Sequence, residues 1–335
     1  MAQIRYDANS LPAEIEGFIT DVRESRTRGL ARVLSMVENG HPSSSMILHS
    51  LYNPDRQGKT IGVTGPPGAG KSTLVNLLIE YWRKLNRNVG VIAVDPSSPF
   101  SGGALLGDRV RMQKHASDPG VFIRSMGSRG HLGGLSGATR DALEVMTAAS
   151  YDPVLVETVG VGQAEVEVAS LADITLLVLV PGFGDEVQTM KAGIMEIADV
   201  IVLNKADRPG IEQLETAVNA SLEFMDDQTK RPPVIKCSAQ TGEGIDYLAS
   251  TVDSLLSSEV AGRDNAKRRT TLILNGIIRE RGSELAKKLI SGEYGSINKA
   301  IESVLSGKTT PYMIGEMFSG FLEGIQEKDN GSKQD

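Results

Sequence analysis

The stretch that decides the fold reads Thr64-Gly65-Pro66-Pro67-Gly68-Ala69-Gly70-Lys71-Ser72-Thr73. From Gly65 to Ser72 it matches the phosphate-binding pattern G-x-x-x-x-G-K-[ST] at every fixed position. The apolar run 61–63 precedes it and predicts a buried strand, and apolar residues at helical spacing follow it from Leu74. Strand, glycine-rich turn and helix is the order in which this pattern binds a nucleotide phosphate, so we predict a P-loop.

The chemistry of a phosphate site explains the residue types in this stretch. Glycines leave the backbone free to wrap closely around a phosphate with its N–H groups pointing inward. The N-terminus of the following helix adds a favourable partial positive charge. Lys71 is expected to reach the β- and γ-phosphates of the nucleotide and act in catalysis, and Ser72 to offer its hydroxyl to Mg²⁺. The sequence thus predicts residues 64–73 as a nucleotide-binding loop that works with Mg²⁺.

Length and composition describe an ordinary globular chain. Its 335 residues suggest one large domain with helical additions, or two domains. A net charge of −7 argues against a nucleic-acid partner, because proteins that bind nucleic acids present a basic surface. No apolar run approaches the ~20 residues of a membrane span. The single cysteine, Cys237, excludes an internal disulfide and suits a reducing compartment. With no targeting signal evident, we expect a cytoplasmic protein with no membrane partner and no nucleic-acid partner.

Strand and helix patterns alternate from about residue 60 to about residue 256. This alternation predicts an α/β fold, namely a P-loop NTPase with a mostly parallel central sheet that is covered on both faces by helices. The expected strands are 60–64, 89–94, 121–124, 154–156, 174–180, 200–203 and 234–237.

Helical extensions are expected at both ends of this central part. Apolar residues at helical spacing predict a helical pair over 11–37, which Gly40 and Pro42 end. The expected parts of the chain are an N-terminal helical extension at 1–50, a nucleotide-binding (G) domain at 51–260, and a C-terminal helical arm with a disordered tail at 261–335.

Acidic residues follow two of the expected strands. Asp95 comes directly after strand 89–94, and Glu157 directly after strand 154–156. Ligands of parallel α/β sheets bind at the carboxyl ends of the strands, and carboxylate oxygens are the ligands that Mg²⁺ prefers. Both residues are therefore expected in the metal site, together with Asp108, which ends the Gly-, Ser- and Pro-rich loop after Asp95. The alternative for either aspartate is a turn or cap role.

The residues after Glu157 are expected to respond to the γ-phosphate. Gly160 can place its N–H on that phosphate because no side chain intervenes, which makes 157–165 a switch segment. Val161 stands where Ras-like proteins carry a water-orienting glutamine, and an apolar side chain cannot orient water. We therefore predict slow intrinsic hydrolysis in which Glu157 and Gly160 take part, helped by Gln163, another loop or a partner.

A second motif selects the base. Asn204-Lys205-Ala206-Asp207 forms N-K-x-D after strand 200–203. The Asp207 carboxylate can accept from the N1–H and the N2 amino group of guanine side by side, whereas adenine has neither donor and would leave it unpaired. Asn204 is expected to contact the base edge or tie loops together, and the Lys205 stem to cover the ring face. Downstream, Ser238-Ala239-Gln240 could place a backbone N–H on guanine O6. The sequence therefore predicts binding of GTP and GDP.

Several of these stretches resemble one family. They are Asp95–Arg109, Arg129–Gly134, Glu157–Gln163 and the motif at 204–207. They are similar to the MeaB/ArgK/MMAA family, GTPases that accompany cobalamin-dependent acyl-CoA mutases, chiefly methylmalonyl-CoA mutase.

The resemblance implies several properties beyond those read from single motifs. It implies that Asp95, Asp108 and Glu157 shape the Mg²⁺ site. It implies a third mobile loop at 181–191, which includes Asp185 and Lys191. It also implies a homodimer that uses the C-terminal helical arm, and a chaperone that protects the mutase and gates its loading with adenosylcobalamin.

Two other classes of protein stay open as alternatives. A nickel metallochaperone GTPase has a related fold, but it needs His- or Cys-rich metal ligands, and four histidines and one cysteine argue against it. The other is a kinase that passes phosphate to a protein, since ArgK-type members have been named transport kinases. The sequence shows neither an acceptor-binding site nor a catalytic base for that reaction.

Overall fold

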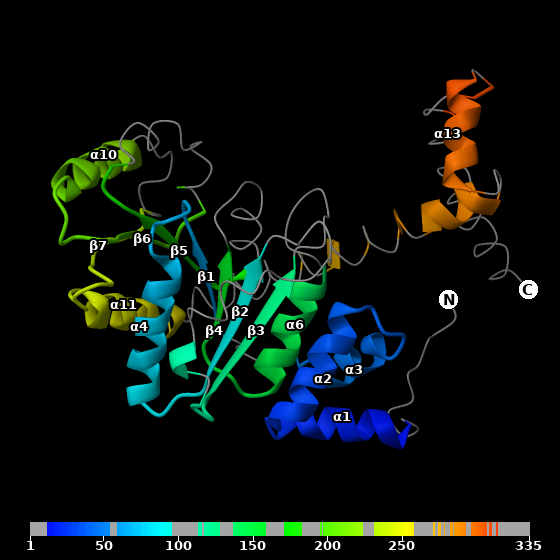
Figure 1. The fold of residues 1–335 in the computed structure, drawn as a ribbon, viewed down its shortest axis with the longest axis horizontal. Coiled ribbons are helices and arrows are strands. Elements are labelled where there is room, and N and C mark those ends of the chain that lie inside the picture. The colour runs from blue at the N-terminus through cyan, green and yellow to red at the C-terminus, as the bar shows by residue number, and fades with distance from the viewer. Residues whose placement is uncertain are drawn as a thin grey trace, which may run out of the picture. The chain divides into compact units, whose positions relative to one another are not determined.

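The computed structural model describes most of the chain. The described residues are 12–53, 59–95, 113–115, 117–127, 137–158, 171–182, 195, 197–223, 231–257 and short stretches between 271 and 313. They belong to two units, one that ends at Leu272 and one that begins at Ile273 (Figure 1).

The first unit is organised around a seven-stranded sheet in the order β3-β2-β4-β1-β5-β6-β7 (Figure 1). Every strand pair is parallel, which confirms the α/β fold and shows the sheet to be entirely rather than mostly parallel. The strands are β1 (Thr60–Thr64), β2 (Val89–Asp95), β3 (Val121–Gly127), β4 (Val154–Thr158), β5 (Ile174–Leu179), β6 (Val200–Leu203) and β7 (Val234–Lys236).

Helices cover both faces of this sheet, as parallel pairing requires. One face packs on α4 (Lys71–Lys84) and α11 (Ile245–Ser257) through residues such as Ile61, Leu78 and Leu248. The other face packs on α6 (Gly137–Ala148) next to β2, β3 and β4, and on α10 (Ile211–Glu223) next to β5 and β6.

The N-terminal helices share a hydrophobic core with the α6 side of the sheet. The expected helical pair is present as α1 (Ala13–Arg23) and α2 (Thr27–Glu38). A third helix, α3 (Ser44–Leu51), follows Pro42, where the sequence analysis expected the helical segment to end. Its eight residues are too short to show a periodic pattern, and it is held by burial of Ile47 and Leu51.

The second unit is helical where it is described. Its best-defined element is α13 (Ile297–Leu305), whose N-cap Ser296 accepts a hydrogen bond from the backbone N–H of Lys299 at 3.2 Å. Apolar side chains of this unit, among them Leu274, Ile278 and Ile301, are more than half exposed. In the described parts of the chain, no helix combines the length and the apolar character needed to cross a membrane.

Candidate nucleotide site

The phosphate loop runs between β1 and α4 at the carboxyl edge of the sheet. Gly65, Gly68 and Gly70 have φ values of +137°, +77° and +87°, which favour glycine. A Cβ on Gly65 would lie 2.2 Å from the carbonyl oxygen of Val178 on β5, and a Cβ on Gly70 would lie 2.6 Å from Asn204 Nδ2. The glycine positions therefore let the turn pass close to the neighbouring strands, and the loop has the strand–turn–helix context that the sequence predicts.

Lys71 is the first residue of α4, and its side chain curls back over the loop. The Nζ atom donates to the carbonyl oxygens of Gly65 at 2.7 Å and Pro66 at 3.0 Å. Lys71 is buried, so its charge acts in a poorly screened environment, where it attracts an anion more strongly than at the surface. The Lys71 ammonium group therefore lies against the phosphate loop, where it could contact a phosphate that the loop binds.

Two oxygen ligands meet beside the phosphate loop. The hydroxyl of Ser72 donates to Glu157 Oε1 at 2.5 Å, and both side chains are buried. Glu157 lies within β4, not after it as the sequence analysis expected, because β4 extends to Thr158. Hydroxyl and carboxylate oxygens suit Mg²⁺, which takes its remaining ligands from phosphate oxygens and water, so the chemistry of these two residues fits part of a magnesium site.

Asp95 is the last residue of β2, two positions beyond Ala93, which pairs with Glu157 on the adjacent strand β4. Its backbone therefore lies at the expected edge of the sheet, while its side chain lies outside what the structure describes. Among the described residues, no group of three or more His, Cys, Asp and Glu side chains could hold a metal ion by itself. The predicted site residues outside the described parts of the chain are Asp108, Gly160, Gln163, Asp185 and Lys191.

Asn204 connects the phosphate loop to the loop after β7. Its Nδ2 donates to the carbonyl oxygen of Ala69 at 2.7 Å, and its Oδ1 accepts from the backbone N–H of Ala239 at 3.0 Å. Of the two roles that the sequence analysis left open for Asn204, these contacts are those of a residue that ties loops together. Lys205 adds a second link, because its Nζ donates to the carbonyl oxygen of Gly68 at 2.7 Å.

Asp207 and Ser238 form the other polar pair of this region. The hydroxyl of Ser238 donates to Asp207 Oδ1 at 2.6 Å and accepts from the backbone N–H of Thr241 at 3.2 Å. The hydrogen bond from Ser238 is the largest cause that lowers the pKa of Asp207 below its ordinary value. The carboxylate is therefore held ionised and oriented, as an acceptor for two adjacent N–H donors should be. Gln240 lies exposed in the following turn.

Cys237 is a neighbour of the site that the sequence analysis did not place there. Its Sγ lies 3.8 Å from Asn204 Oδ1, and burial raises its pKa to about 12. The sequence analysis placed Cys237 at the end of strand 234–237, whereas β7 ends at Lys236. The only signal for its place beside the site is that it directly precedes Ser238. The buried thiol acts as a small apolar side chain that packs against the Asn204 side chain.

These features are found together in a known family. A family model described as methylmalonyl Co-A mutase-associated GTPase MeaB matches residues 30–290. The chain belongs to the MeaB family of GTPases. This confirms the family resemblance and the GTPase activity that the phosphate-loop and N-K-x-D motifs predict.

Relatives of this MeaB-family chain are found in several organisms. A Pyrococcus abyssi protein assigned as a GTPase is 43% identical over 90% of this chain and 95% of its own length. The GTPase ArgK of Escherichia coli is 39% identical over 69% of this chain and 72% of its own length. A crystal structure described as a LAO/AO transport system kinase has a TM-score of 0.68 and 26% identity, and the match covers 94% of this chain and 100% of that one.

Proposed function

We propose that this MeaB-family GTPase is a Mg²⁺-dependent nucleotide switch whose client is a cobalamin-dependent acyl-CoA mutase, with methylmalonyl-CoA mutase as the first candidate. The observation that carries the proposal is the family match over residues 30–290, because that family is described by its association with this mutase. A similar mouse protein, 34% identical over 77% of this chain and 66% of its own length, is named a methylmalonic aciduria type A homolog.

The described residues suggest how the phosphates are held. The backbone of residues 64–73 and the Lys71 ammonium would neutralise the charge on the β- and γ-phosphates. Ser72 and Glu157, with Asp95 and Asp108, would hold Mg²⁺, which when bound supplies further neutralisation of the phosphate oxygens. For Ser72 this requires its hydroxyl to turn from Glu157 toward the ion. We assign the Gly160 N–H to the γ-phosphate, and the orientation of the attacking water to Gln163, another loop or a partner.

Guanine selection rests on the pair formed by Asp207 and Ser238. An ionised carboxylate accepts the two adjacent donors of guanine, and Ser238 keeps the Asp207 carboxylate both ionised and fixed in direction. The Ala239 N–H already donates to Asn204, so a guanine carbonyl would have to share this donor or take the next one in the loop.

Loss of the γ-phosphate would release the segments that contact it, and the client would read that change. We assign Asp185 and Lys191 to a segment of this kind. In this role the protein would protect the mutase and admit intact adenosylcobalamin. A homodimer formed through the C-terminal arm after residue 261 belongs to the same proposal, and the exposed apolar side chains Leu274, Ile278 and Ile301 are compatible with it.

The deciding experiment measures GTP turnover with and without purified methylmalonyl-CoA mutase, alongside a Lys71→Ala control. Slow basal turnover that rises several-fold with the mutase and disappears in the control is the expected result. Turnover that stays the same in the presence of acyl-CoA mutases would leave the GTPase activity in place and refute the proposed client.

A phosphotransferase is the second candidate, favoured by the description of the similar crystal structure as a transport system kinase. Incubation with γ-labelled GTP and candidate acceptor proteins separates the two functions. Label on a protein would favour the kinase, and label only in free phosphate would favour the switch.

A further inference from the structure

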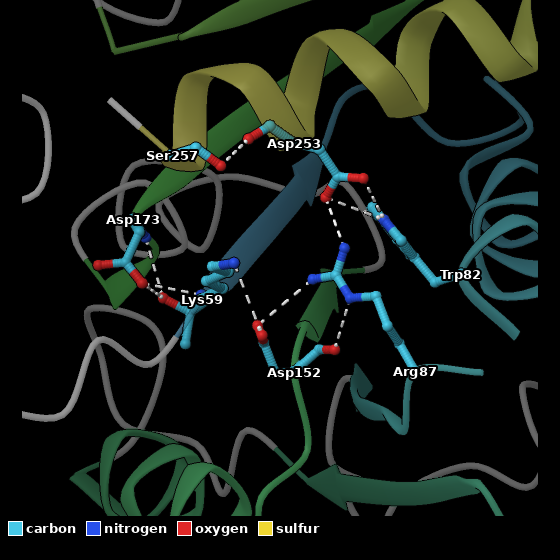
Figure 2. A network of polar contacts seen from close by, with 8 residues as sticks. Lys59, Trp82, Arg87, Asp152, Asp173, Asp253 and Ser257 are labelled. Carbon is cyan, nitrogen blue, oxygen red and sulfur yellow. Dashed lines mark hydrogen bonds and ion pairs between the residues drawn. The ribbon is translucent and has the colours of Figure 1, made fainter. Parts of the chain in front are cut away.

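A network of polar side chains lies around the segments that lead into β1, β2 and β4 (Figure 2). Because these strands are parallel, the segments are at the amino edge of the sheet, opposite the phosphate loop and the loop 238–244. Arg87, between α4 and β2, is its centre. Its Nη1 donates to Asp253 Oδ1 at 2.7 Å, its Nε donates to the backbone carbonyl oxygen of Asp152 at 3.1 Å, and its Nη2 lies 3.5 Å from Asp152 Oδ1. Lys59, just before β1, lies 3.7 Å from Asp152 Oδ2 on the other side. The network therefore joins segments that enter β1, β2 and β4.

Asp253 brings α11 into this network. Its carboxylate accepts from the indole Nε1 of Trp82, with both oxygens 3.2 Å from that nitrogen, and from Arg87 (Figure 2). Trp82 is fully buried on α4, and the Arg87 guanidinium lies 5.8 Å from the centre of its ring. Within the described residues, Asp253 is the one α11 side chain that hydrogen bonds to another element. It therefore fixes the position of α11 along α4, which apolar packing alone leaves less defined.

Each of these two helices begins at a nucleotide loop. α4 starts with Lys71 at the end of the phosphate loop. α11 starts at Ile245, directly after the loop 238–244. That loop is short and internally bonded, with Ser238 N–H donating to the Glu243 carbonyl at 2.9 Å. It has little freedom of its own, so it should follow the start of α11.

We propose that Arg87 and Asp253 are positioning residues for guanine binding. Their contacts set α11 against α4 about 12 Å, or eight residues, from the start of α11, and thereby set the spacing between the loop 238–244 and the phosphate loop. The proposal rests on the assignment of that loop and Asp207 to guanine. Because Asn204 also holds Ala239 directly, loss of the contact between Arg87 and Asp253 makes the loop 238–244 less well positioned but does not detach it.

The predicted consequence is a change in substrate affinity and not in chemistry. Lys71 is held by the carbonyl oxygens of the phosphate loop and Ser72 by Glu157, so a shift of the loop 238–244 mainly removes contacts to the base, which the ground state and the transition state share. Such a loss raises KM and leaves kcat unchanged. We expect KM to rise about three- to tenfold, the factor for losing roughly one hydrogen bond to the base.

The test uses Asp253→Asn in the full chain, which removes one of the two carboxylates that pair with Arg87 but keeps an oxygen for Trp82. Asp246→Asn is the matched control, because Asp246 is an exposed carboxylate on the same helix that makes no side-chain hydrogen bond or ion pair to another element within the described parts of the chain. We expect a raised KM for GTP with unchanged kcat in Asp253→Asn and wild-type values in Asp246→Asn. A fall in kcat at unchanged KM indicates only loss of folded enzyme and overturns the proposal, as does an unchanged KM.

Two further variants close the remaining gaps. Arg87→Lys keeps the charge but cannot bridge Asp152 and Asp253 at once, so it should reproduce the raised KM even if Asp253→Asn does not fold; a wild-type KM here refutes the proposal. Asp207→Asn tests the guanine site itself. If it leaves KM unchanged, the site assignment fails and the positioning proposal fails with it. If it raises KM while Asp253→Asn and Arg87→Lys do not, only the positioning proposal fails.

Discussion

Replacing Asn204 with alanine tests the link between the two nucleotide loops most directly. The Asn204 side chain is 1% exposed and bonds the Ala69 carbonyl at 2.7 Å and the Ala239 N–H at 3.0 Å. Removing the amide takes away one bond from each backbone group. Each group then loses about 0.5–1.5 kcal/mol of net hydrogen bonding, or about 1–3 kcal/mol if water cannot replace it. Because Asn204 is buried, water has little access to replace either bond, and the unfolding free energy should fall by about 2–6 kcal/mol.

The assay is urea unfolding followed by circular dichroism, with and without GDP. A ligand that binds only the native state adds stability according to its concentration and dissociation constant, so the added stability reports GDP affinity. We expect Asn204→Ala to lower both the stability of the free protein and the additional stability that GDP provides. Asn204→Asp is a stricter variant, because it keeps the shape but places an acceptor oxygen against the Ala69 carbonyl.

Asn219→Ala supplies the matched control for this experiment. Asn219 is exposed on α10, where alanine is the better helix former and its effect should stay within about 0.5 kcal/mol. If Asn204→Ala cost less than about 1 kcal/mol, or if GDP stabilised the variant as much as the wild type, the amide would not hold the two loops together.

Three other predictions follow from buried or paired side chains. Burial raises the pKa of Cys237 from 9.0 to about 12, so the thiol loses its proton at a lower pH in the unfolded chain than in the folded protein. The free energy of unfolding should therefore fall as the pH rises from 9 to 12. Thermal melts should show a larger fall for the wild type than for Cys237→Ala. Thr175 is fully buried and its hydroxyl has no partner among the described residues, so Thr175→Val should leave urea stability unchanged or raise it; a loss above about 1 kcal/mol would contradict this. Arg83 makes a bidentate ion pair with Asp118 at 2.8 and 2.9 Å, and this pair lowers the pKa of the Asp118 carboxyl. Arg83→Met should lower the free energy of unfolding by about 1 kcal/mol at neutral pH, and the loss should shrink in urea titrations at lower pH as Asp118 becomes protonated. A loss that does not change with pH would contradict a contribution from this ion pair.

The sheet could be predicted because its strands are almost uniformly apolar. β1, β4, β5 and β6 are buried along their whole length, and a strand covered on both faces needs an unbroken apolar run. β3 and β4 run further than expected because polar residues continue the ladder, as at Ser125 in β3 and Thr158 in β4. Side-chain polarity does not report backbone pairing, so a pattern of apolar residues ends such strands too early. β5 and β7 instead end one residue earlier than expected, at Leu179 and Lys236.

Contacts between distant parts of the chain were the least predictable. N-K-x-D and the phosphate loop were each recognised, but the bond between Asn204 and Ala69 joins residues 135 positions apart. The pair formed by Arg87 and Asp253 spans 166 positions, and neither residue belongs to a motif. Local patterns predict single helices and strands. The long-range contacts depend instead on the order of the strands within the sheet, which these local patterns do not show.

Two charged side chains of the candidate nucleotide site, Lys71 and Glu157, are buried although burial of a charge lowers stability. Both lie at the carboxyl edge of the sheet, and their burial is unfavourable unless a partner offsets it. In the described structure the protein itself supplies the offset, through two carbonyls for Lys71 and the Ser72 hydroxyl for Glu157. A nucleotide phosphate and a cation would offer stronger partners to the same atoms, since charge–charge contacts exceed bonds to neutral groups at low dielectric. The internal bonds thus hold the Lys71 and Glu157 side chains in place, and binding of a phosphate and a cation would have to replace some of these bonds.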